Sequence, residues 1–568
     1  MEKDRLPHWD LGPIYPSVDS NEFKADLARI YELKDVITGN LESFSIAKLL
    51  SLLSEAGALV SNTSSYASAI LSTNTSESAY MKAVNDAEAA ENAYQEAWQA
   101  FVRSASFRRD EFSSPELKDY SLLLSEIEVL SRHQMSEAEE NLALDFLLLS
   151  SSSWERLQQA ITSSASNGGM TLIELRALST QPSREVRRDA YMREKAILKE
   201  HETALAYSLN GVKGTTLLLE KRRGWTDPLE RSLFLSRTSR KALDALVSAI
   251  EDKIGMFRSY LALKARLLGL ERLAWYDIAA PVGRSGRMYS FKEAKEIVVS
   301  SFSSFSPKMG DFVRRAFDEN WIDAEPRKGK AGGAYDTSFK KAGVSRVLLN
   351  YDYTYEGVST LAHELGHAYH DSIVMDLPML LSDYPMTLAE TASIFSETLV
   401  FSDMLSSLDR CDQLPVIEQF VSSATQCCLD ILSRFYFESS AFEKRRKGEL
   451  SASDFSALML DAQNRTYGDS VDEKHEYMWA VKSHYYSESF SFYNYPYAFG
   501  ELFALSLFAE SRRDPDFPRK YDELLRRTGM EDARTVASLS GADIEDKAFW
   551  LSGLDVIEQY AKELESWL

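Results

Sequence analysis

His363, Glu364 and His367 are the residues whose types and spacing are best suited to chemistry. They lie in LAHELGHAYH, a segment from Leu361 to His370 that holds three of the chain's eight histidines. On a helix, residues four apart share one face, so the two imidazoles can bind a single metal ion. Glu364 is rotated away from that ion but can reach a water beside it and act as a general base, as in the H-E-x-x-H arrangement.

A third metal ligand is expected from another segment. The longer H-E-x-x-H-x-x-G-x-x-H pattern needs glycine where His370 stands and histidine where Ile373 stands, and both requirements fail. His370 therefore stays open as either a ligand or a surface residue. Apolar residues at helical spacing predict that this segment is a helix with a buried stripe, formed by Val358, Leu361, Leu365 and Tyr369.

Two glutamates in the following segment, MTLAETASIFSETLVF, are candidates for the third ligand. Glu390 and Glu397 are seven apart, so on a helix they share one face and either could approach the histidines. Glu390 has a competing structural interpretation, because Thr387 and Glu390 fit the spacing of a helix capping box. Glu397 could instead orient an imidazole from behind, or be a plain charge on the helix surface.

The elements that must position these residues are mostly helical. Apolar periodicity predicts helices from about residue 22 to 271 and again after about residue 354. Between them, SRVLLNYDY has the length and composition of a strand. Its segment from Val347 to Asn350 could pair with an extended peptide or simply support the helix. PRKGKAGGAYD lacks the spacing of a phosphate-binding loop, so it is either a wall beside a cleft or a connector.

Composition excludes several classes of partner. The formal net charge of −22 disfavours binding to nucleic acid and to anionic membranes. No run of about 18 uncharged apolar residues predicts a membrane-spanning helix. The three cysteines, Cys411, Cys427 and Cys428, do not form a disulfide framework. Free thiols and an N-terminus without an apolar signal core favour a cytoplasmic location.

Taken together, these segments resemble the oligoendopeptidase F group of thimet-oligopeptidase-like zinc peptidases. VLLNYDYTYEGVSTLAHELGHAYH resembles the active-site strand and helix of that family, and AETASIF followed by SE resembles its third-ligand helix. WDLGPIYPS, LAWYDIAAPV and WIDAEPRKGKAGGAYD resemble further family segments, so the likeness spans nearly the whole chain. The resemblance implies one Zn²⁺ per chain, held by His363, His367 and Glu390. By the helix geometry given above, Glu397 would then orient one of the imidazoles.

The resemblance also implies a fold and a substrate site. The expected fold is mainly α, a large two-lobed helical ellipsoid with a deep central channel and a small β-sheet near the zinc-binding helix. Residues 1–200 would form part of the channel wall, and residues 201–568 the catalytic domain. KSHYYSESFSFYNYPYAFGELFAL resembles the segment that supplies a histidine and tyrosines to the substrate. It indicates His484 and Tyr497 as catalytic residues, with Tyr493 and Tyr495 binding substrate. Asn350, at the end of the segment that could pair with a peptide, is a further candidate for substrate binding.

The predicted function is zinc-dependent endoproteolysis of short peptides, with Glu364 as the general base. The first alternative is a zinc carboxypeptidase or dipeptidase that uses the same helix motif. The second is a catalytically silent peptide-binding protein with a structural metal, although a structural site does not require Glu364. Short peptides are the expected partners, with no nucleic acid or membrane, and the chain could be a monomer or a homodimer.

Overall fold

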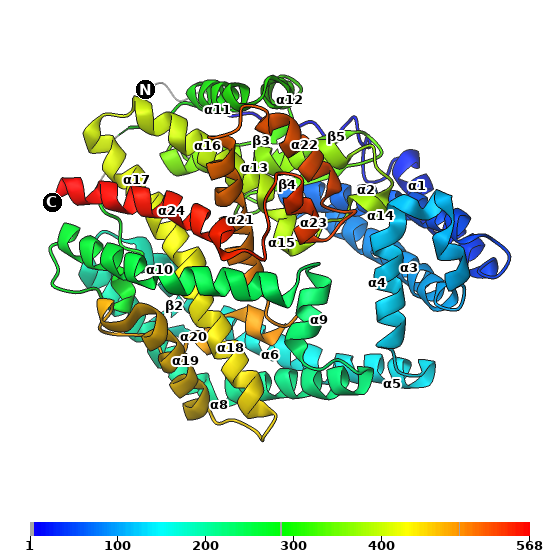
Figure 1. The fold of residues 1–568 in the computed structure, drawn as a ribbon, viewed down its shortest axis with the longest axis horizontal. Coiled ribbons are helices and arrows are strands. Elements are labelled where there is room, and N and C mark those ends of the chain that lie inside the picture. Colours follow the sequence, from blue (N-terminus) through cyan, green and yellow to red (C-terminus); the bar gives the residue numbers. More distant parts are fainter. Residues whose placement is uncertain (1–4, 284–286, 488) are drawn as a thin grey trace. The chain divides into compact units, whose positions relative to one another are not determined.

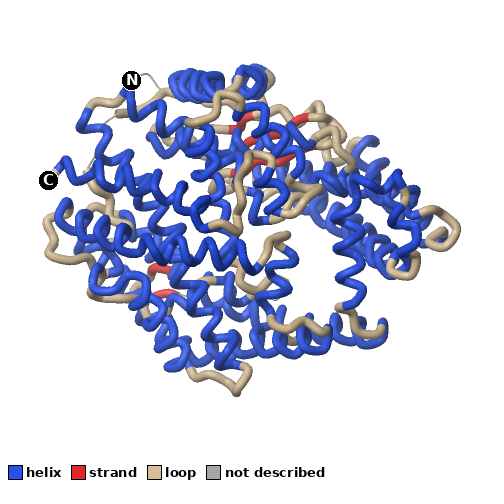
Figure 2. The backbone as a smooth tube through the Cα atoms, in the orientation of Figure 1, coloured by secondary structure: helices blue, strands red, loops and turns tan. Residues whose placement is uncertain are grey.

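Helices dominate the computed structural model, which describes residues 5–283, 287–487 and 489–568 (Figures 1 and 2). The helical pattern expected in the first half of the chain is confirmed. The alanine-rich segment, for example, forms the single helix α3 (Ser78–Ala105). The small sheet expected near the zinc-binding helix is also present. No helix in the described ranges combines the length and apolar character needed to span a bilayer.

The chain folds as two compact units, each assembled from three separated stretches. Unit 1 comprises Met1–Ser131, Arg287–Ser407 and Glu510–Ala542, and unit 2 comprises Arg132–Gly286, Leu408–Ala509 and Asp543–Leu568. The boundary expected between residues 200 and 201 lies inside the long helix α8 (Arg184–Arg223). The functional division at that point and the central channel stay predictions.

Unit 1 holds the three-stranded sheet and the helix that carries the histidine motif. Its helices are α1 (Asn21–Gly39), α2 (Ile46–Thr73), α3, nearly all of α4 (Ser121–Arg132), α11 (Phe291–Phe305), α12 (Pro307–Asp318), α13 (Tyr355–Val374), α14 (Met379–Ser382), α15 (Met386–Ala389), α16 (Thr391–Ser407), α22 (Phe517–Arg527) and α23 (Ala533–Ser538). Its strands are β3 (Ile322–Asp323), β4 (Tyr335–Phe339) and β5 (Val344–Leu348).

Unit 2 is almost entirely helical. Its helices are α5 (Glu137–Leu149), α6 (Ser151–Ser164), α7 (Leu172–Ala177), α8, α9 (Pro228–Leu235), α10 (Arg240–Leu267), α17 (Arg410–Thr425), α18 (Ile431–Arg445), α19 (Ala452–Tyr467), α20 (Met478–Val481), most of α21 (Tyr495–Ser511) and α24 (Lys547–Glu563). The short strands β1 (Ser166–Asn167) and β2 (Met170–Thr171) form a separate hairpin. A π-helical turn, Gln426–Asp430, joins α17 to α18.

The strand order of the sheet in unit 1 is β3–β5–β4. β5 pairs in parallel with β3 and antiparallel with β4, where Asp336 lies opposite Val347. Both edges of β5 are therefore occupied. The suggestion that the strand containing Val347 to Asn350 pairs with a peptide is therefore wrong for β5, which is the central strand. β4, which continues from the glycine-rich segment, is an edge strand of the sheet.

Helix α13 begins and packs as its sequence predicts. The Thr354 side chain caps it by accepting a hydrogen bond from the backbone N–H of Gly357. The predicted apolar stripe, from Val358 to Tyr369, is fully buried. α13 packs against β4 and β5 and also against α16, so the histidine motif lies where the sheet meets a second helix (Figure 1).

Candidate metal centre

Three side chains in unit 1 converge as a possible metal-binding group: His363, His367 and Glu390. Their ligand atoms all lie within 4.8 Å of one another. The Nε2 atoms of His363 and His367 are each 3.4 Å from Glu390 Oε2. The sequence predicted this pairing of one helix with its successor.

These distances fit a zinc ion. Two ligand atoms that are each about 2.0–2.1 Å from a tetrahedral zinc lie about 3.3–3.4 Å apart. Two imidazole nitrogens and one carboxylate oxygen also form a common donor set of catalytic zinc sites, in which the fourth position is open. The residues present therefore fit the group that the resemblance implies.

The pKa shifts within the cluster indicate that a positive charge at its centre would stabilise it. Burial on its own would raise the pKa of Glu390, but the hydrogen bonds and charges of the two imidazoles lower it far below its usual range. Burial likewise opposes protonation of His363, yet the Glu390 and Glu397 carboxylates raise its pKa well above the usual value. A divalent cation would supply the same positive charge without protonating either histidine.

Glu390 reaches the histidines because a helix break precedes it. It lies directly after α15 and before α16, and the hydroxyl of Ser393 donates a 2.7 Å hydrogen bond to its Oε2. The capping box suggested for Thr387 and Glu390 is not formed, since Pro385 occupies the N-cap of α15 without a side-chain cap. The carboxylate is thus free to face the imidazoles.

Gly366 allows α13 and α16 to approach closely enough for this contact. A Cβ atom at this position would lie 2.6 Å from the carbonyl oxygen of Ala392 and 2.8 Å from Cα of Ser393. Only glycine avoids this overlap with the α16 backbone. Sequence reasoning missed Gly366, although a glycine inside an otherwise regular helix is a signal of close backbone approach.

Glu397 contacts His363 from the side opposite the ligand atom. Its Oε2 lies 3.2 Å from His363 Nδ1, and its Oε1 accepts a 2.7 Å hydrogen bond from Ser359. With the proton on Nδ1 facing the carboxylate, the Nε2 lone pair faces Glu390 and His367. The geometry is that of an orienting residue, even though the Glu397 side chain is 42% exposed.

Glu364 lies beside the cluster and is only 7% exposed. Burial raises the pKa of its carboxyl group, while the neighbouring histidines act in the opposite direction. A backbone hydrogen bond from Asp336 in β4 also opposes the rise. The carboxylate therefore feels the charges of the metal-binding group and accepts a hydrogen bond from the edge strand of the sheet.

His370 lies outside the metal-binding group. Its ring is fully buried, and its Nε2 is 2.8 Å from the hydroxyl oxygen of Thr528. Burial, as the main cause, lowers the pKa of His370 to about 3. It is neither a ligand in this structure nor the surface residue that was the alternative.

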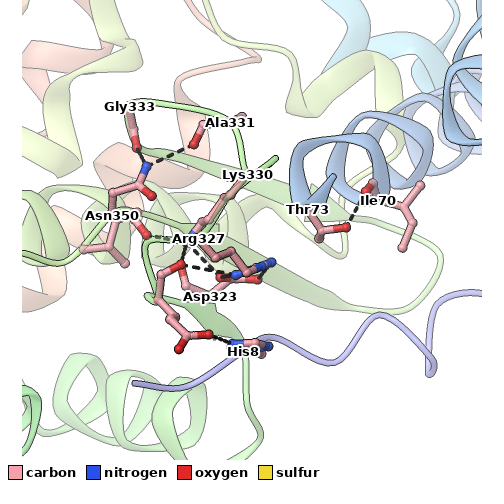
Figure 3. Close-up of polar contacts among 11 residues, drawn as sticks. His8, Ile70, Thr73, Asp323, Arg327, Lys330, Ala331, Gly333 and Asn350 are labelled. Carbon is pink, nitrogen blue, oxygen red and sulfur yellow. Dashed lines mark hydrogen bonds and ion pairs between the residues drawn. The ribbon is translucent and has the colours of Figure 1, made fainter. Parts of the chain in front are cut away.

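Asn350 organises the glycine-rich segment that precedes β4. Its side-chain amide donates to the carbonyls of Ala331 and Gly333, at 3.0 and 3.2 Å (Figure 3). In the same segment, Lys330 Nζ donates to the carbonyl of Leu349 at 2.7 Å and pairs with Asp323 at 2.8 Å. The substrate contact predicted for Asn350 stays a prediction, and the structure shows that its N–H groups hold the chain itself.

The predicted substrate residues near the C-terminus lie in unit 2. His484 Nε2 is 3.5 Å from the Tyr497 hydroxyl, and its ring centroid is 5.0 Å from that of Tyr493. Tyr495 is placed elsewhere: it is 2% exposed, and its hydroxyl donates to the carbonyl of Ser232. Tyr495 is therefore a core residue and not a binding residue.

Comparison with known proteins agrees with this site. Residues 177–556 match the model of peptidase family M3. An oligoendopeptidase F homolog of Lactococcus lactis is 25% identical over 402 residues, which are 68% of this chain and 65% of the relative. The chain thus spans slightly less than two thirds of that relative. Group B oligopeptidase PepB of Streptococcus agalactiae is 22% identical over 80% of this chain and 77% of the relative.

Solved structures show the same fold. A crystal structure of a Chlamydophila abortus protein aligns with a TM-score of 0.86 at 21% identity, covering 99% of this chain and 98% of that one. Oligoendopeptidase F of Enterococcus faecium aligns with a TM-score of 0.67 at 17% identity, covering 96% and 98%. These structures confirm the fold, and the sequence relatives above confirm the resemblance to the oligoendopeptidase F group. Since the family match also covers more than half of the sequence and includes every residue of the metal-binding group, the chain belongs to peptidase family M3.

Proposed function

We propose that this chain is a zinc-dependent endopeptidase that hydrolyses short peptides. The observation that carries the proposal is the convergence of His363, His367 and Glu390 beside the buried carboxyl group of Glu364. A zinc ion held by these three residues would supply Lewis-acid polarisation of the scissile carbonyl and lower the pKa of an adjacent water.

Glu364 is the proposed general base. It takes the proton of the attacking water at a carboxylate oxygen and later gives it to the nitrogen of the leaving amine. Its burial supports this role, because a raised carboxyl pKa lies closer to the working pH and makes the carboxylate a stronger base toward the water. Glu397 keeps the proton of His363 on Nδ1, which directs Nε2 toward the metal.

The edge of β4 is the proposed binding surface for the peptide backbone. A peptide that adds to this edge would form main-chain hydrogen bonds, which do not depend on side-chain identity. Asp336 lies on β4 and touches Glu364, so a strand added here would run past the base. Broad sequence tolerance follows from this mode. The roles of His484, Tyr493 and Tyr497 toward the substrate stay predictions.

Substitution of the base tests the proposal. Glu364→Gln should retain one zinc per chain and lose nearly all turnover, because the amide cannot accept the proton of the water. Zinc content is measured by metal analysis, and cleavage by mass spectrometry of a peptide mixture. Exposed Glu319→Gln is the control and should keep wild-type rates. Normal cleavage by Glu364→Gln would eliminate the proposed mechanism.

The carboxypeptidase or dipeptidase alternative requires a free peptide terminus. A peptide blocked at both ends separates the two functions, since an endopeptidase still cuts it. Zinc binding without hydrolysis of any peptide in a diverse mixture would instead favour the silent binding protein.

A further inference from the structure

Unit 2 contains a cavity of about 150 Å³ that is separate from the metal-binding group. It has room for a small organic ion, since about 15 Å³ is enough for one water. Aromatic rings such as Trp275 form part of its wall. The charged residues that line it are Arg176, Arg187, Glu194, Asp430 and Lys482.

All but one of these charged side chains have a partner of opposite charge. Each pair is short and lies within unit 2, so each of these side chains already has a partner before a ligand binds. The pairs are Arg176 with Glu194 at 2.5 Å, Arg187 with Asp277 at 2.9 Å, and Asp430 with Arg434 at 2.5 Å. Lys482 is the remaining charge.

Lys482 has no acceptor for its ammonium group within the described part of the chain. Burial, followed by the positive charge of Arg434, lowers the pKa of Lys482 to about 8. Two further donors nearby are buried and unpartnered among the described residues, namely Nε of Arg434 and Nδ2 of Asn494. The two residues are joined by a 3.0 Å bond from Arg434 to the side-chain oxygen of Asn494. This region thus has more hydrogen-bond donors than acceptors.

The surroundings of the cavity are also irregular in a way that is frequent at functional sites. Gln426 and Asp430, which line it, belong to the π-helical turn between α17 and α18. Lys482 lies two residues before His484. Burial, and then the charges of Arg434 and Lys482, lower the pKa of His484 to about 4. These charges are therefore close to the His484–Tyr497 pair.

We propose that Lys482 binds a carboxylate group in this cavity, supplied by the free C-terminus or by an acidic side chain of a peptide. A carboxylate would give the ammonium group its missing counter-charge and accept charge-assisted hydrogen bonds. The inference rests on the proposed function only in naming a peptide as the carrier of the carboxylate. If Lys482 binds a carboxylate, the protein prefers anionic peptides even though its own net charge is negative.

Chemical labelling tests the site without catalysis. The zinc-loaded Glu364→Gln chain is treated with an acylating reagent near pH 8, and acylation of Lys482 is measured by mass spectrometry against exposed Lys199. Three peptides of equal length are compared: a free C-terminal acid, its amide, and the amide with one internal glutamate. Protection of Lys482 by the acid alone assigns the C-terminus, and protection by the glutamate peptide assigns an acidic side chain. Equal labelling with all three peptides overturns the proposal.

Kinetics provide a second test. In the wild type, kcat/KM should favour the acid peptide over its amide, or the glutamate peptide over the plain amide. Lys482→Met should reduce that ratio about tenfold or more, the usual loss when a charge-assisted hydrogen bond is removed. Lys482→Arg, which keeps the positive charge, should retain most of that kcat/KM ratio. An unchanged ratio in Lys482→Met overturns the inference, while an inactive wild type refutes the proposed function and leaves the labelling result valid.

Discussion

Replacing His370 with glutamine should make the protein less sensitive to acid. The His370 ring stacks on Tyr384 with centroids 4.1 Å apart, and its Nε2 lies 2.8 Å from Thr528 Oγ1. The Thr528 hydroxyl donates its proton to the carbonyl of Leu525, so Nε2–H must be the donor to Thr528. Nδ1 is buried without a partner among the described residues. Protonation would place a charged N–H there with no acceptor.

The size of the effect follows from the pKa of His370, which falls from 6.5 to about 3 in the folded chain. Above pH 6.5 the ring is neutral in both states and has no effect. Below pH 6.5, the His370 ring takes up a proton in the unfolded chain but not in the folded chain, so the free energy of unfolding decreases as the pH falls toward 3. At pH 5 the loss is about 2 kcal/mol, since each pH unit below 6.5 contributes about 1.4 kcal/mol.

Urea unfolding near pH 7.5 and pH 5 measures this loss. Wild type should lose more stability between the two conditions than His370→Gln, by about 2 kcal/mol. Other titrating groups, including the metal ligands, are common to both chains and cancel in the comparison. Part-exposed His201→Gln is the control and should behave as wild type. An equal loss in wild type and His370→Gln would refute the assignment of His370 as a buried neutral ring.

Three further substitutions test the supports of the site. Gly366→Ala should sharply reduce zinc content in metal analysis, because the new methyl group would lie 2.6 Å from the carbonyl oxygen of Ala392 and push α16 away. Glu397→Gln should weaken zinc binding about 10–100-fold in chelator competition, the usual loss when the partner of a ligating histidine is changed. Lys330→Met should lower the free energy of unfolding by about 3 kcal/mol or more in thermal unfolding, because it removes one partner of the buried Asp323 carboxylate. The exposed control Lys328→Met should change the free energy of unfolding by less than about 0.5 kcal/mol.

The histidine helix could be predicted from sequence because its information is local. The spacing of His363 and His367 fixes their common face, and the apolar stripe fixes which face is buried. The choice between Glu390 and Glu397 could not be made in this way. Periodicity treats them as equivalent positions on one helix, whereas the structure ends α15 just before Glu390 and turns its carboxylate to the imidazoles.

Local sequence patterns could not predict features that depend on contacts between segments far apart in the chain. The sequence identified the strand that became β5 but could not show that β3 and β4 occupy both its edges. Tyr495 and Tyr497 belong to one aromatic run, yet only the packing of α21 shows that the first is buried against Ser232. The place of Gly366 likewise depends on a helix that begins 25 residues later, at Thr391.

The glycine-rich segment before β4 explains how a strand edge comes to lie beside Glu364, the proposed base. Side chains hold this segment: Lys330 and Asn350 donate to its carbonyls and to those of neighbouring strands (Figure 3). The segment can therefore stay fixed without a strand pairing with the outer edge of β4. Asp336, on that strand, donates a backbone hydrogen bond to Glu364, so the strand that this segment leads into also contacts the proposed base. Lys330→Met, which loosens this segment, should consequently disturb Glu364 through β4.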